Sequence, residues 1–86
     1  MGKHEKLLLK ILSGSSDANI NVEDLRNLLK DFGFVMRVRG SHHIFRKEGI
    51  AEKINLQQDG NKAKPYQVRQ VRNILVKYKL GGYIDV

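Results

Sequence analysis

The sequence predicts an α+β two-layer sandwich, in which helices cover one face of a three-stranded antiparallel sheet and leave the other face open. Three observations support this prediction. Apolar residues recur at helical spacing before residue 33, alternate with other residues between residues 34 and 57, and return to helical spacing after Pro65. A chain of 86 residues holds one modest hydrophobic core, so we expect one small domain.

The first 20 residues are expected to form a short amphipathic helix and a linker, appended to a main domain at residues 21–86. Four apolar side chains share one face of this helix: Leu7, Leu8, Ile11 and Leu12. The polar run at residues 13–17 ends it. Because an apolar face needs a partner, we expect the helix to dock on its own domain.

A second helix is predicted after Asn21, a good N-cap residue. Glu23 and Asp24 follow in the first turn, where negative charge complements the helix dipole. Gly33 stands where a left-handed residue usually ends a helix. The apolar residues of this helix keep to one face: Val22, Leu25, Leu28, Leu29 and Phe32.

The alternating segment predicts three short strands that pair as an antiparallel meander. Gly40-Ser41 and Glu48-Gly49 are the expected turns, so the second strand spans residues 42–47 and the third spans residues 51–57. The first strand begins at Phe34, with apolar residues on one face and basic residues on the other. Its inward set is Phe34, Met36 and Val38, and its outward set includes Arg37 and Arg39.

The second strand allows two orientations. Its neighbours Ile44 and Phe45 are both apolar and lie on opposite faces, so either parity could be inward. The pattern therefore leaves the facing of His42 undecided.

The last helix is predicted to begin at Pro65, which suits the first helical position, and to end at Gly81-Gly82. Arg69 and Arg72 lie off its apolar face. That face consists of Val68, Val71, Ile74, Leu75 and Tyr78.

Charge is distributed unevenly along the chain. The net charge is +7, and residues 33–86 carry all of the excess, with eleven cations and four anions. A field of this kind attracts nucleic acids and steers them without sequence preference.

The composition excludes several classes of protein. The chain has no cysteine, which rules out a disulfide framework, a thiolate nucleophile and a cysteine zinc site. No apolar run approaches the roughly 20 residues that span a bilayer, and the first residues lack the pattern of a signal peptide. We therefore expect a cytoplasmic protein without a membrane partner.

Two adjacent histidines, His42 and His43, follow Gly40-Ser41 in the basic part of the chain. Histidine is the usual general acid or base, and neighbouring cations could bind a phosphodiester. The competing interpretation is an exposed or hydrogen-bonded pair without a catalytic role. A metal site is not expected, because adjacent strand residues point to opposite faces and no carboxylate cluster accompanies them.

The loop before the last helix, GNKAK at residues 60–64, could place Lys62 and Lys64 beside a phosphate. It lacks the glycine pattern of a phosphate-binding loop. A solvated connection between strand and helix explains it equally well.

Three segments occur in a familiar order: LLKDFGF at residues 28–34, RGSHHIF at residues 39–45, and GNK at residues 60–62 followed by Lys64-Pro65. Together they resemble the HicA toxins, small prokaryotic ribonucleases of the HicAB toxin–antitoxin systems. The resemblance covers roughly residues 22 to 80. Residues 1–20 extend beyond the minimal pattern of that family.

The resemblance implies a double-stranded-RNA-binding-domain-like fold of order α-β-β-β-α, cleavage of mRNA, and one catalytic histidine after the Gly-Ser pair. That histidine is His42 here, and Ser41 and His43 hold supporting positions. The implied protein partner is a HicB-like antitoxin. No metal and no small-molecule cofactor would be needed, because the 2′-hydroxyl of the substrate can act as nucleophile. The cations expected to assist catalysis or to hold the RNA backbone are Arg37, Arg39, Arg46, Lys62, Lys64, Arg69 and Arg72.

Two other functions use the same basic surface. One is a non-catalytic RNA-binding module, and the other is an interaction domain for an acidic protein. Cleavage of RNA in the presence of EDTA separates the first from a nuclease, and absence of RNA binding would identify the second.

Overall fold

The computed structural model describes residues 3–57 and 60–80. Along the described chain, the elements are α1 (Lys3–Ser13), a short 3-10 helix η1 (Asp17–Asn19), α2 (Val22–Asp31), β1 (Val35–Arg39), β2 (His42–Arg46), β3 (Ile54–Gln57) and α3 (Pro65–Lys77). The strands form an antiparallel sheet in the order β1-β2-β3. The predicted α+β class and the three-stranded antiparallel sheet are therefore confirmed.

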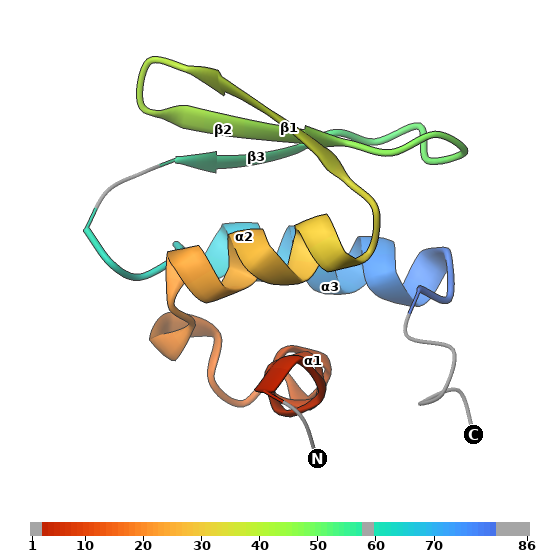
Figure 1. Ribbon diagram of the computed structural model, residues 1–86. Helices are drawn as coiled ribbons and strands as arrows, with labels where there is room; N and C mark the ends of the chain where they lie inside the picture. Colours follow the sequence, from red (N-terminus) through yellow and green to blue (C-terminus); the bar gives the residue numbers. More distant parts are fainter. Residues whose placement is uncertain (1–2, 58–59, 81–86) are drawn as a thin grey trace.

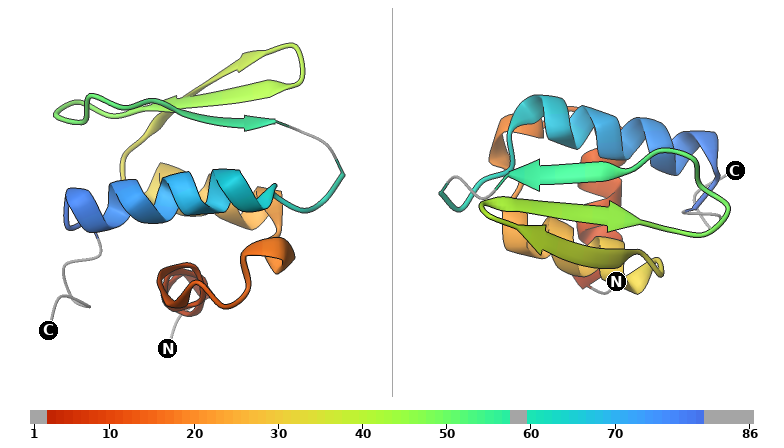
Figure 2. Two further views of the ribbon diagram at one scale, coloured as in Figure 1. Left: turned by 180° about the vertical axis from the view of Figure 1, so that it is seen from behind. Right: turned by 90° about the horizontal axis from the view of Figure 1, so that it is seen from above.

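The helices form two layers, not one. Helices α2 and α3 cover one face of the sheet, and α1 crosses beneath them on the side away from the sheet (Figures 1 and 2). Neighbouring residues such as Leu28 and Leu29 are both buried, although they point about 100° apart around α2. The middle helices thus offer apolar surface in two directions. Leu8 and Ile11 of α1 are fully buried in the same core, so the expected two-layer sandwich has a third layer.

The ends of α2 follow their sequence signals. The Asn21 side chain accepts a hydrogen bond from the Asp24 backbone N–H at 3.1 Å, which caps the N-terminus of the helix. After the helix, Gly33 has a φ of 93°, a conformation that glycine adopts without strain. The chain then enters β1.

A two-residue turn joins β1 to β2. Gly40 has a φ of 58° at the first turn position, which a type II′ hairpin turn gives to glycine. The turn sets the register, with Arg39 opposite His42 and Arg37 opposite Ile44. Arg37, Arg39, His42 and Ile44 therefore share one face of the sheet.

The inner face of the sheet is unevenly covered. Phe34 and Leu56 are buried against the helices, as the alternation predicts. Phe45 is buried there too, which resolves the orientation of β2 that the sequence pattern left open. Val38 is on the predicted face, opposite the buried His43, but it is 57% exposed, so only its expected burial is wrong. The reason is visible in Figure 1, where β1 rises away from the helices as it approaches the hairpin turn.

Four predicted boundaries shift. β1 begins at Val35 and β2 ends at Arg46, each one residue inside its predicted limit, and two larger shifts affect β3 and α3. The third strand begins at Ile54 rather than at residue 51, because Ile50 turns into the core and its N–H donates to the Lys47 carbonyl at 3.1 Å. Helix α3 ends at Lys77, and Lys79 takes a positive φ of 53°. The predicted stop at Gly81-Gly82 lies outside the described residues. In the described part of the chain, no helix is long and apolar enough to cross a membrane.

A polar cluster ties the segment before β3 to the end of α3. Glu52 accepts hydrogen bonds from the Tyr78 hydroxyl and from Lys77 Nζ, the latter at 2.9 Å. These hydrogen bonds lower the pKa of Glu52 from 4.5 to about 2, and the bond from the Tyr78 hydroxyl has a larger effect than the bond from Lys77. The carboxylate is therefore stabilised in its charged form by the fold.

Glu52 is predicted to make folding sensitive to acid. Because its pKa is lower in the folded state, the unfolded chain binds more protons between pH 4.5 and about 2. The stability that Glu52 contributes is full above pH 4.5 and is lost as the pH falls toward 2. In urea unfolding, the free energy of unfolding of the wild type should exceed that of Glu52→Gln at pH 6. This difference should shrink as the pH falls from 4.5 toward 2. A difference independent of pH would contradict the assignment.

Candidate nucleic-acid interface and catalytic histidine

The register of the sheet resolves the facing of His42. His42 and Ile44 alternate with the buried His43 and Phe45, so His42 lies on the open face, away from the helices. Arg39 is directly opposite His42 on β1, and Gln57 is directly opposite it on β3. The histidine thus sits near the hairpin turn, with neighbours from both flanking strands.

Asn55 orients the His42 ring. His42 Nδ1 lies 3.1 Å from Asn55 Oδ1. With the amide oxygen as acceptor, Nδ1–H donates and the lone pair of the neutral ring resides on Nε2. The arrangement leaves Nε2 available to take or return a proton.

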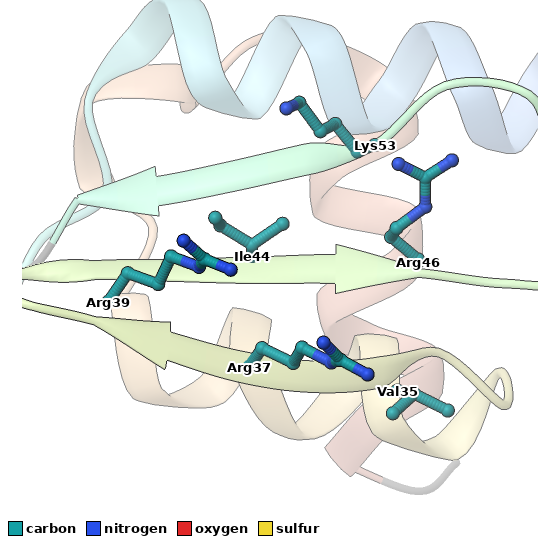
Figure 3. Close-up of a pocket in the computed structure, with 6 residues that line it drawn as sticks. All are labelled: Val35, Arg37, Arg39, Ile44, Arg46 and Lys53. Atoms are coloured by element: carbon teal, nitrogen blue, oxygen red, sulfur yellow. The ribbon is translucent and has the colours of Figure 1, made fainter.

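A shallow basic basin lies beside this histidine on the open face. It has a volume of about 720 Å³, and Figure 3 shows the cationic side chains arranged around Ile44. The side chains come from β1, from β2 and from the segment that enters β3. The lining residues of the basic basin are Val35, Arg37, Arg39, Ile44, Arg46 and Lys53.

The open face is rich in basic side chains. No Asp or Glu occurs in β1, β2 or β3. Among the described residues, none of the four cations of the basin forms an ion pair with a carboxylate. A concave surface with several cations of this kind concentrates anions such as phosphodiesters.

His43 has a different environment. It faces the helices and is 8% exposed. Burial lowers its pKa, as do the nearby charges of Arg26 and Lys30, while a backbone hydrogen bond with Leu56 acts in the opposite direction. His43 is therefore held in its neutral form inside the domain, and the sheet separates it from the open face.

The other predicted site residues divide by position. Ser41 is exposed in the hairpin turn immediately before His42. Lys64 Nζ donates to Gln57 Oε1 at 3.2 Å, which brings its charge to the side chain opposite His42. Lys62 is exposed, and its backbone forms an isolated β-bridge with Asn21.

Arg69 and Arg72 lie on α3, beneath the sheet, and are not brought to the open face. Arg69 is exposed. Arg72 Nη1 donates to Asp17 Oδ1 at 2.8 Å and to the Ile11 carbonyl at 3.2 Å. Arg72 thus joins α3 to the N-terminal segment, a role that composition alone does not distinguish from phosphate binding.

Two residues of the open face were missed by sequence reasoning: Asn55 and Lys53. The signal was present, because Ile54 and Leu56 are inward and their neighbours must then face outward. What the sequence lacked was the register between β2 and β3. That register places Asn55 opposite Ile44 and within reach of His42.

Among the described residues, no three His, Cys, Asp or Glu side chains come together in a group that could hold a metal ion. Comparisons with protein-family models, with curated proteins and with solved structures find no match for this chain.

Proposed function

We propose that this chain is a metal-independent endoribonuclease that cleaves mRNA with His42 as general acid or base. The observation that carries the proposal is the position of His42: it lies on an open face beside a basin of four cations, with its ring oriented by Asn55. Proton transfer and phosphate binding are the two requirements of metal-free RNA cleavage, and this face offers groups for both.

The reaction follows from these groups. The 2′-hydroxyl of the RNA attacks the adjacent phosphorus while a base such as His42 Nε2 accepts its proton. The bond to the 5′-oxygen of the next nucleotide breaks, and an acid returns a proton to that oxygen. The products are a 2′,3′-cyclic phosphate and a 5′-hydroxyl. Arg39 lies opposite His42 on β1, and Lys64 donates to Gln57, which lies opposite His42 on β3. These two cations would stabilise the negative charge on the phosphate oxygens.

The biological assignment rests on the resemblance of residues 28–34, 39–45 and 60–65 to the HicA toxins. We propose that the chain is the toxin of a type II toxin–antitoxin system and that a HicB-like antitoxin neutralises it. The order α2-β1-β2-β3-α3 would then be a double-stranded-RNA-binding-domain-like fold. An acidic antitoxin surface would match the net charge of +7.

A non-catalytic RNA-binding module is the second candidate, because the basic basin by itself serves binding as well as cleavage. Incubation of labelled RNA with the purified chain in EDTA separates the two. The proposal expects cleavage of the RNA, with DNA of the same sequence left intact. RNA that is bound but never cut would support the binding module instead.

RNA binding is predicted to weaken with salt in proportion to the cations that meet phosphates. If the four cations of the basin each meet one phosphate of a single strand, log K should fall against log salt with a slope of about −3. Fluorescence anisotropy across a salt series measures this slope. Arg46→Gln should reduce its size by about 0.7, whereas Arg69→Gln, with the same charge change on α3, should leave it unchanged. A slope near zero would rule out backbone binding on this face.

Asn55 is predicted to support cleavage by orienting His42. Asn55→Ala removes the hydrogen bond to Nδ1 and frees the ring, so the cleavage rate should fall by about tenfold while RNA affinity stays the same. Asn55→Asp, which can also accept from Nδ1–H, should retain more activity than the alanine variant. Equal rates for wild type and Asn55→Ala would show that the contact does not position the histidine.

A further inference from the structure

The outer edge of β1 exposes both backbone and apolar side chains. Val35 is 66% exposed and Val38 is 57% exposed, although they lie on opposite faces of the sheet. In the right-hand view of Figure 2, no other described element lies beside this strand at the level of the sheet. The edge is therefore accessible along its whole length.

The register with β2 determines which backbone groups point outward. Arg39 and His42 flank a two-residue turn and form a hydrogen-bonded pair, and such pairs alternate along an antiparallel ladder. Arg37 thus directs its N–H and C=O toward β2. Met36 and Val38 direct theirs away from β2, so their backbone groups lie on the open edge.

This edge has little protection beyond its short length and its two arginines. Exposed edge strands are commonly protected by short length, charged side chains, a proline, a bulge or an inward-pointing charge. β1 contains neither Pro nor Lys, its ladder to β2 is continuous, and its helix-facing residues are Met36 and Val38. On the β3 side, Gln70 Nε2 of α3 donates to the Lys53 carbonyl at 3.2 Å, immediately before the strand begins.

We propose that the edge of β1 binds an extended segment of a partner protein as an additional strand, and that this segment alternates acidic and apolar residues. Its carboxylates would lie beside Arg37 and Arg39 on the open face, and its apolar residues beside Met36 and Val38 on the other face. A second copy of this chain does not fit, because the arginines of two β1 strands would meet on one face. The inference does not depend on the nuclease reaction.

A synthetic peptide of alternating Glu and Val tests the edge directly, with the matched Gln–Val peptide as control. By fluorescence anisotropy, the Glu–Val peptide should bind the full chain at least about tenfold more tightly. In amide hydrogen exchange, it should protect the N–H groups of Met36 and Val38. Equal affinities for the two peptides, or protection confined to the helices, would overturn the proposal.

Val38→Pro is the sharpest variant, because it removes an N–H that points to the open edge and leaves the ladder to β2 in place. It should weaken peptide binding at least about tenfold, whereas Val38→Thr, which keeps the N–H and loses only part of the apolar contact, should bind clearly more tightly than Val38→Pro. A folded Val38→Pro chain that binds the peptide like the wild type would contradict the proposal.

The charge-swapped double variant Arg37→Glu, Arg39→Glu keeps the test decisive if Val38→Pro fails to fold. It should prefer a Lys–Val peptide over the Glu–Val peptide. An unchanged preference would show that these arginines do not select the partner. A wild-type dimer that Val38→Pro dissociates would assign the edge to a second copy and overturn the proposal.

Discussion

Replacing His42 with alanine is expected to reduce RNA cleavage by at least about a hundredfold, because it removes the group that transfers protons on the open face. The fold should persist, since the side chain is only half-buried and its one described hydrogen bond is to the exposed Asn55. RNA affinity should change little, because the four cations of the basic basin remain. Cleavage of a labelled RNA under single-turnover conditions measures the rate, and anisotropy measures the affinity.

His4→Ala is the matched control for this substitution. His4 lies on α1, where it pairs with Asp31, and α1 is in the layer farthest from the sheet. The control should cleave RNA at the wild-type rate. A His42→Ala variant that cleaves as fast as His4→Ala would remove His42 from the proposed chemistry.

Replacing Phe45 with alanine is expected to lower the free energy of unfolding by about 3–5 kcal/mol. Phe45 is fully buried on the inner face of the central strand, so truncation leaves a cavity between the sheet and the helices. A domain of this size has only roughly 4–13 kcal/mol of stability in total, so the variant should lose a large fraction of it and unfold at a much lower urea concentration than the wild type. Urea unfolding followed by circular dichroism measures the loss.

Val35→Ala provides the comparison on the same sheet. Val35 is on β1 and largely exposed, so its truncation should cost less than about 1 kcal/mol. Similar losses for the two variants would contradict the placement of the core between the sheet and α2 and α3.

The elements with local signals could be predicted from the sequence. The Asn21 cap, the Gly33 terminator, the Gly40-Ser41 turn and the Pro65 start each depend on one or two residues, and the structure has all four. The third layer could not be predicted, because an amphipathic pattern shows that α1 must dock but not where. The early end of α3 at Lys77 likewise has no signal as strong as Gly81-Gly82.

The site depends on pairing between strands, which a single sequence does not specify. Alternation separates His42 from His43, but only the register to β1 and β3 shows that His42 shares a face with Arg37 and Arg39. The same register brings Asn55 to the ring. Arg72 was expected to bind RNA, but it forms an ion pair with Asp17 instead. The two residues are 55 positions apart, so the sequence gives no sign of this pair.

Analysis of the RNA ends produced in EDTA tests the central claim most directly, because each mechanism leaves its own chemical signature. Wild-type protein should leave a 2′,3′-cyclic phosphate and a 5′-hydroxyl, and should not cut an RNA whose 2′-hydroxyls are all methylated. His42→Ala should leave both RNAs intact. Products with a 3′-hydroxyl and a 5′-phosphate, or cleavage of the methylated RNA, would contradict cleavage by the 2′-hydroxyl with His42 as proton-transfer group.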